Sequence, residues 1–185
     1  MKKTIVVNLF AGPGAGKSTG MAGLFYKLKL AGVDVEMVTE YAKDKVWENN
    51  KKAFKCQSLL TGKQIYRISR CYGKVDVIVT DSPICLGAIY DSDNSKGFEQ
   101  HVVDQFRKFS DNGINFFINR VKPYNPNGRL QTEEESIAID KELLEFMKKH
   151  NIQYTTIDGD DEGYTKAFNI IIDLLSKTKS DNKVD

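Results

Sequence analysis

A glycine-rich loop near the start of the chain carries residue types that bind phosphate. The segment GPGAGKST follows an apolar run that ends at Phe10. Backbone N–H groups beside glycines approach a phosphate closely, and the start of the following helix adds a favourable dipole. A nucleotide is therefore expected to bind to residues Gly12, Pro13, Gly14, Ala15, Gly16, Lys17, Ser18 and Thr19, called the phosphate loop below.

Two side chains of the phosphate loop have more specific expected roles. Lys17 is predicted to reach the β- and γ-phosphates, which makes it a catalytic candidate, and the Ser18 hydroxyl is predicted to ligate Mg²⁺. Ala11 stands where the usual signature begins with glycine. Its side chain would touch no phosphate, so the substitution is compatible with the motif. A chance glycine-rich turn is the alternative, which the preceding strand and the following helix disfavour.

Two carboxylates stand where predicted strands end. Asp81 follows the β-rich run VDVIVT and is expected beside the Mg²⁺ as a catalytic and metal-binding residue. Its alternative role is a turn or helix cap before Ser82 and Pro83. Glu40 ends another strand, and we expect it to bind the acceptor and accept the proton of its hydroxyl. The alternative for Glu40 is a solvent-facing glutamate at a helix start.

Three cations lie close together in the segment NRVKPYNPNGR. They are Arg120, Lys122 and Arg129, on a stretch too rich in proline, asparagine and glycine for a buried element. We expect a lid segment at about residues 120–135, in which the two arginines act on the transferring phosphate and Lys122 contacts substrate. The acidic run at 133–135 supports the alternative, a surface network of ion pairs.

Acceptor-binding candidates also follow the second strand. Gln64, Arg67 and Arg70 share one side of a predicted helix, and Tyr41 offers an aromatic ring to an acceptor base. These residues are expected to bind the base or the phosphate of an acceptor. A solvated helix face, or for the aromatic ring a place in the core, is the alternative.

Alternating hydrophobic patterns predict the elements that position these residues. Strands are expected at 4–10, 33–39, 75–80, 114–119 and 152–157, with helices between them. Helical material at 42–71 is expected to break near Thr61 and Gly62, and 91–97 to form a polar loop. The last helix is expected after a turn at 158–163. This order predicts a single α/β domain over 1–185, with a parallel sheet covered on both faces and functional groups at the carboxyl ends of its strands.

Composition narrows the classes of protein. The net charge of +2 gives no general reason to expect nucleic acid or membrane binding, and the apolar runs are too short to span a bilayer. Three cysteines without a C-x-x-C pair argue against structural zinc and favour reduced thiols in a cytoplasm.

The motifs GPGAGKST, TEYAKD, VIVTDSP and RVKPYNPNGRLQTEEES resemble those of P-loop nucleoside and nucleotide kinases, in particular compact phage-type domains. The resemblance implies a three-layer α/β/α fold with a five-stranded parallel sheet ordered 2-3-1-4-5, ATP as donor, and Mg²⁺. It also implies the site residues Lys17, Ser18, Glu40, Asp81, Arg120 and Arg129. Ser82 and Pro83 stand where several of these kinases have arginine, and the lid arginines are spaced differently, so the substrate does not transfer.

Several functions remain open on the sequence. The leading hypothesis is an ATP- and Mg²⁺-dependent phosphotransferase acting on a nucleoside, a nucleotide or a similar small molecule. A kinase acting on a hydroxymethylated base in DNA is the less favoured alternative. The third hypothesis is a nucleotide-gated switch or ATPase, although the chain has Asn119-Arg120-Val121-Lys122 without the aspartate of a GTPase motif. The acceptor and the oligomeric state stay undetermined.

Overall fold

Five parallel strands form the centre of the molecule. The computed structural model describes residues 2–92, 96–110 and 113–181, without the side chains of 179–181. The sheet order is β2-β3-β1-β4-β5, as expected. The strands are β1 (Ile5–Phe10), β2 (Val35–Val38), β3 (Val77–Thr80), β4 (Ile114–Asn119) and β5 (Thr155–Asp158).

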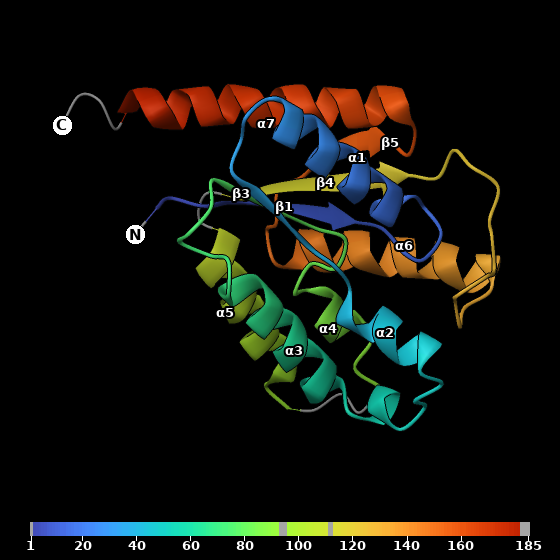
Figure 1. Ribbon diagram of the computed structural model, residues 1–185. Coiled ribbons are helices and arrows are strands. Elements are labelled where there is room, and N and C mark those ends of the chain that lie inside the picture. Colours follow the sequence, from blue (N-terminus) through green and yellow to red (C-terminus); the bar gives the residue numbers. More distant parts are fainter. Residues whose placement is uncertain (1, 93–95, 111–112, 182–185) are drawn as a thin grey trace.

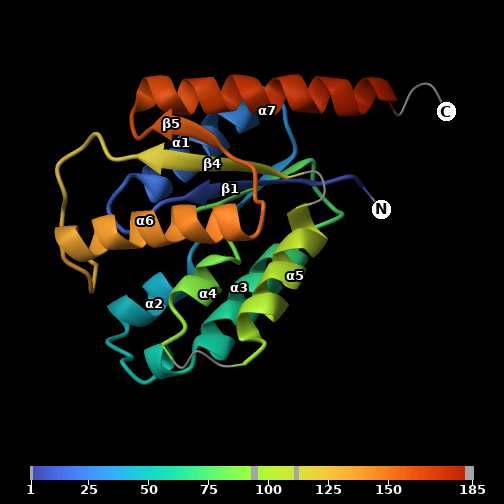
Figure 2. The ribbon, with the colours of Figure 1, turned by 180° about the vertical axis from the view of Figure 1, so that it is seen from behind.

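Helices cover both faces of this sheet. Helices α1 and α7 lie on one face, and α3, α5 and α6 lie on the other (Figures 1 and 2). The helices are α1 (Lys17–Leu30), α2 (Tyr41–Trp47), α3 (Gln57–Ser69), α4 (Leu86–Ile89), α5 (Phe98–Ser110), α6 (Glu133–Lys149) and α7 (Asp161–Asp181), with a 3₁₀ turn, η1, at Ala53–Lys55. None of the helices in the described part of the chain is both long and apolar enough to cross a membrane.

Side chains of the central strand β1 alternate between two apolar clusters. Val7 and Leu9 pack with α1 and α7, whereas Val6 and Phe10 pack with α3, α5 and α6. All six residues of β1 are buried, which is typical of a parallel strand covered on both faces. The strand that leads into the phosphate loop is therefore fixed from both sides.

The structure differs from several sequence-based boundaries, and β2 and β3 each begin two residues later than expected, at Val35 and Val77. The helical segment after β2 breaks at 48–56, where Asn49 adopts a positive φ of 52° beyond α2, and not at Thr61 and Gly62. Thr61 is buried within α3, so packing keeps that helix continuous. The fifth strand begins at Thr155, later than expected, and α7 begins at Asp161 inside the expected turn. Residues 93–95 of the expected polar loop lie outside the described residues.

The start of α6 is fixed as the sequence predicts. Thr132 accepts a hydrogen bond from the Glu135 N–H (3.2 Å), and the Glu135 carboxylate accepts one from the Thr132 N–H (2.7 Å). This reciprocal capping box satisfies two N–H groups that a helix start otherwise leaves unpaired. It sets where the lid segment ends and α6 begins.

Leu143 tests the packing of α6 against the sheet. Its side chain is fully buried in the cluster that includes Phe117 and Met147. We expect Leu143→Ala to lower the free energy of unfolding by about 2–5 kcal/mol, because it removes apolar contacts and leaves a cavity. Urea unfolding measures this loss. Leu30→Ala, at a side chain that is 71% exposed, is the matched control, and its free energy of unfolding should stay within about 0.5 kcal/mol of the wild type. Equal losses in the two variants would contradict the packing of Leu143 against the sheet.

Candidate functional site

The phosphate loop joins β1 to α1 and has the backbone that its glycines allow. Gly14 and Gly16 have positive φ angles of 84° and 107°. A Cβ on Gly14 would lie 2.7 Å from the ring of Tyr124, and one on Gly12 would lie 2.4 Å from the Ser136 carbonyl oxygen. Glycine is therefore required by conformation at two positions and by close approach at Gly12. Ala11 is buried and has an ordinary negative φ, in agreement with its expected tolerance.

Lys17 turns back onto its own loop. Its ammonium donates hydrogen bonds to the carbonyl oxygens of Ala11 (2.7 Å) and Gly12 (2.9 Å). Burial lowers the pKa of Lys17, and the negative charges of Glu40 and Asp81 oppose that shift. The positive charge thus lies inside the loop, near two carboxylates that come from other strands.

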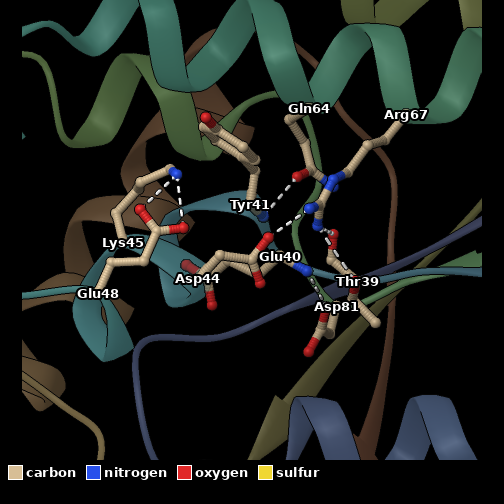
Figure 3. A network of polar contacts seen from close by, with 9 residues as sticks. All are labelled: Thr39, Glu40, Tyr41, Asp44, Lys45, Glu48, Gln64, Arg67 and Asp81. Atoms are coloured by element: carbon tan, nitrogen blue, oxygen red, sulfur yellow. Dashed lines mark hydrogen bonds and ion pairs between the residues drawn. The ribbon is translucent and has the colours of Figure 1, made fainter. Parts of the chain in front are cut away.

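Glu40 and Asp81 meet at the carboxyl edge of the sheet. The Asp81 Oδ1 accepts a hydrogen bond from the Glu40 N–H (3.1 Å), so Asp81 holds the turn that presents Glu40 (Figure 3). Burial raises the pKa of both carboxyl groups, and the nearby Lys17 charge opposes this in each case. The nearby Ser18 hydroxyl also favours the charged form of Asp81 and so acts to lower its pKa. Parallel strands end at the same edge, which brings the loop and both acids together.

Ser18 and Asp81 offer oxygen atoms of the kind that Mg²⁺ prefers. The Ser18 residue is exposed, whereas Asp81 is buried, and the two side chains are near enough for Ser18 to oppose the rise that burial causes in the pKa of Asp81. Within the described residues, no cluster of three or more His, Cys, Asp or Glu side chains could hold a metal ion by itself. A bound Mg²⁺ would thus need oxygen ligands from a nucleotide or water in addition to these two residues.

Gln64 and Arg67 stabilise the turn between β2 and α2. The Gln64 side chain accepts a hydrogen bond from the Tyr41 N–H (3.0 Å) and donates one to the Thr80 hydroxyl (3.4 Å). Arg67 donates to Thr39 and pairs with Asp44 (Figure 3). Both side chains thus bind their own chain here, and their contact with an acceptor stays a prediction.

Arg120 clamps the phosphate loop to α6. Its guanidinium donates to the Asp140 carboxylate (2.5 Å) and to the carbonyl oxygens of Pro13 (2.6 Å) and Ser136 (3.1 Å). The Asp140 carboxylate also accepts a hydrogen bond from the Gly12 N–H (2.5 Å). Arg120 thus lies at the phosphate loop with its guanidinium bonded to the protein, and its action on a transferring phosphate stays a prediction.

Sequence reasoning missed Asp140, although a signal for it exists. Asp140 stands in helical register with the buried residues Ser136, Leu143 and Met147 of α6. An acid on the apolar stripe of a helix needs a partner, because burying an isolated charge is costly. That pattern predicts an inward ion pair, here with Arg120.

The rest of the lid segment covers the phosphate loop through Tyr124. The Tyr124 ring contacts Gly14, its hydroxyl donates to the Gln131 carbonyl oxygen (2.6 Å), and the Arg129 guanidinium lies 5.6 Å from the ring centre. Arg129 donates to carbonyl oxygens of its own loop, at Asn125 and Asn127. This side chain therefore stacks on the lid, while Arg120 reaches the phosphate loop.

The lid segment also contacts helices α2 and α7. Gly128 lies against the ring of Trp47 in α2, where an added Cβ would be 2.8 Å from the indole. Lys122 lies 5.9 Å from the ring centre of Tyr164, whose hydroxyl donates to the Gly16 carbonyl oxygen (3.0 Å). Sequence reasoning missed Tyr164, whose pKa burial raises to about 12. The lid segment and α7 thus contact the two ends of the phosphate loop.

A small cavity lies beside Glu40. It measures about 30 Å³, and its polar lining comes from Glu40, Gln57, Thr61, Gln64, Ser82 and Tyr90. Burial raises the pKa of Tyr90, and the Glu40 charge adds to this effect, so its hydroxyl stays a proton donor near neutral pH. The volume suits one or two water molecules, so a larger molecule requires the surrounding helices to move apart.

Comparisons with known proteins agree with this geometry. The order of the strands, the phosphate loop and the acids at the sheet edge are those of a P-loop NTPase domain, as expected. A family model described as an AAA domain (AAA_28) matches residues 6–162, and the chain belongs to this family. No curated protein sequence matches the chain.

Among solved structures, the fold is similar to that of a NadR protein in complex with NR. The TM-score is 0.65 at 16% sequence identity, over 94% of this chain and 52% of the other. The chain therefore spans about half the length of that structure's chain. At this identity the similarity concerns the fold.

Asp140 allows a test of the clamp on the phosphate loop. Asp140→Asn keeps an oxygen for the Gly12 N–H but removes the charge that faces Arg120, and Asp140→Ala removes both contacts. We expect the affinity for a fluorescent ATP analogue to fall about tenfold, or ~1.4 kcal/mol, in the alanine variant and less in the asparagine variant. Glu145→Ala, at an exposed position of α6, is the matched control. Wild-type affinity in Asp140→Ala would contradict the clamp.

Glu40 makes stability depend on pH in a defined direction. Burial raises its pKa in the folded protein, so the folded state holds the proton more tightly than the unfolded state does. The stability associated with Glu40 is then fully present below the ordinary glutamate pKa of about 4.3 and falls as pH rises above it. Glu40→Gln should therefore gain stability relative to the wild type as pH rises from about 4 to 8.

Urea unfolding at several pH values measures this difference. The control Glu145→Gln makes the same change of carboxylate to amide at an exposed position. A constant difference between Glu40→Gln and the wild type across the whole pH range would show that Glu40 is not desolvated.

Proposed function

We propose that this domain transfers the γ-phosphoryl group of ATP, with Mg²⁺, to a hydroxyl or phosphate group of a nucleoside, a nucleotide or a similar small acceptor. The observation that carries the proposal is the meeting of Glu40, Asp81 and Lys17 at one edge of the sheet, beside a polar cavity. A protein that only binds a nucleotide needs only the phosphate loop. Glu40 is a carboxylate that also lines a separate polar cavity and has a pKa raised by burial, which suits proton transfer from an acceptor.

Each residue of the site has a distinct role in this proposed reaction. Backbone N–H groups of the phosphate loop bind the donor phosphates, and the Lys17 ammonium leaves the Ala11 and Gly12 carbonyl oxygens to neutralise the transferring group. Ser18 and Asp81 would hold Mg²⁺, which when bound offsets negative charge on the phosphates. Arg120 and Tyr124 keep the loop in place, and Arg129 is the lid arginine left to approach the phosphate when the lid rearranges.

For a hydroxyl acceptor, Glu40 accepts the proton as the acceptor oxygen attacks phosphorus. The O–H bond of the acceptor breaks, a new O–P bond forms, and the bond between the γ-phosphorus and the bridging oxygen breaks to release ADP. The cavity lined by Gln57, Gln64 and Tyr90 supports this proposal, because its polar groups surround the place that an acceptor next to Glu40 would occupy.

An acceptor screen tests the reaction. ADP release in the presence of Mg²⁺ should be slow with ATP alone and rise at least about a hundredfold with the right nucleoside or monophosphate, as positioning of the acceptor implies. The molecule NR named with the NadR structure belongs in the screen. Fast ATP hydrolysis that no acceptor increases would instead favour the nucleotide-gated ATPase.

Glu40→Gln separates binding from transfer. We expect it to retain affinity for ATP but to lose about 10²–10⁴-fold in turnover with the identified acceptor, since the amide cannot take up the proton. Lys17→Ala should lower both affinity and turnover, because Lys17 contacts the donor. Unaltered turnover in Glu40→Gln would remove Glu40 from the mechanism.

A further inference from the structure

The positive charge of the molecule is concentrated in one segment. Residues 41–74, which contain α2, η1 and α3, carry nine lysines and arginines against two acids, a net charge of +7. Because the whole chain carries +2, the remaining residues together carry −5. The low total therefore conceals a strongly basic surface on the acceptor side of the candidate site.

A groove runs along this basic segment. It lies between the edge strand β2 and helix α3 and has a volume of about 370 Å³. Three cations and two aromatic rings line it, together with residues 37–39 of the β2 edge. These side chains are Lys63, Arg67, Arg70, Tyr41 and Tyr66.

The cations of the groove differ in how they are compensated. Arg67 is bound to Thr39 and Asp44, and its guanidinium stacks 5.0 Å from the centre of the Tyr41 ring (Figure 3). Lys63 and Arg70 are exposed, and neither forms an ion pair with any residue that the structure describes. On one side of the groove, Arg67 and Tyr41 are held by their own contacts. Lys63 and Arg70 add two positive charges that no acidic side chain compensates in the part of the chain that the structure describes.

Tyr66 adds an exposed aromatic surface between these charges. Its side chain is 61% exposed, and the Arg70 guanidinium lies 5.9 Å from the ring centre. A merely solvated basic face needs no large aromatic ring in a groove. Cations that bind phosphates beside rings on which bases stack are the combination that single-stranded nucleic acid requires.

We propose that this groove binds single-stranded nucleic acid, with phosphates at Lys63 and Arg70 and a base on Tyr66. Thr39 and Tyr41, which both line the groove, flank Glu40 in the chain. A bound strand therefore contacts the residues on either side of Glu40 in the chain. The binding itself does not depend on phosphoryl transfer, and only the use of the strand as an acceptor rests on the proposed function.

Fluorescence anisotropy with a labelled oligothymidylate of about ten nucleotides tests the groove. We expect reversible binding that weakens about sevenfold between 50 and 200 mM salt, if the two phosphates at Lys63 and Arg70 are neutralised. Lys63→Glu combined with Arg70→Glu should weaken binding at least about tenfold. Tyr66→Ala, which changes no charge, should weaken it about fivefold or more through lost stacking.

The matched control reverses two charges elsewhere. Lys166→Glu combined with Lys177→Glu makes the same change in net charge on exposed positions of α7, on the opposite face of the sheet (Figure 1). It should leave oligonucleotide affinity within about twofold of the wild type at moderate salt. Urea unfolding of every variant verifies that the folded state is retained.

Three results would overturn the proposal. One is an equal loss of affinity in the two double variants, which would mean that only net charge matters. Another is unchanged affinity in Tyr66→Ala together with equally tight binding of heparin, which would reduce the groove to a general polyanion surface. The third is binding to phosphatidylserine vesicles in preference to the oligonucleotide. Because all of these measurements omit ATP, they remain informative even if no acceptor is phosphorylated.

Discussion

The ion pair between Arg120 and Asp140 fixes the phosphate loop in place. A loop that binds phosphate through its backbone has few side chains with which to hold its own shape, because its glycines bring no side-chain contacts. Here the first turn is held by the Asp140 carboxylate at the Gly12 N–H and by Arg120 at the Pro13 carbonyl oxygen. Both side chains come from the segment after β4, so the loop depends on the packing of α6 against the sheet.

Three ionisable side chains lie together at the carboxyl edge of the sheet, where burial makes their charged forms less stable than they are in water. Lys17, Glu40 and Asp81 are all shifted toward their neutral forms by burial, and each opposite charge only partly offsets this. Such an arrangement lowers stability, and ionisable groups perturbed in this way cluster at the functional sites of proteins. The cost is distributed over three strands, each of which is anchored by one or both apolar clusters.

Much of the fold is predictable from local patterns. The strand β1 and the glycines after it are adjacent in sequence, and the rule that parallel strands end at one edge is sufficient to bring Glu40 and Asp81 to that loop. The helix break near Asn49 was not predictable in this way. Gly62 is the stronger helix breaker by propensity, but buried neighbours in α3 keep the helix continuous there, so tertiary packing outweighs propensity.

The sequence by itself predicted the features of the candidate site, which are a phosphate loop, two acids at strand ends and a basic lid segment. Each of these features depends only on residue type and on position relative to a strand. Only the tertiary structure decided which groups those side chains contact. It directed Arg120 to Asp140, Arg67 to Asp44 and Tyr164 to Gly16, and it gathered charge at the groove beside β2. The physical reason is that local sequence sets backbone conformation, whereas ion pairs and stacking depend on which distant elements pack side by side.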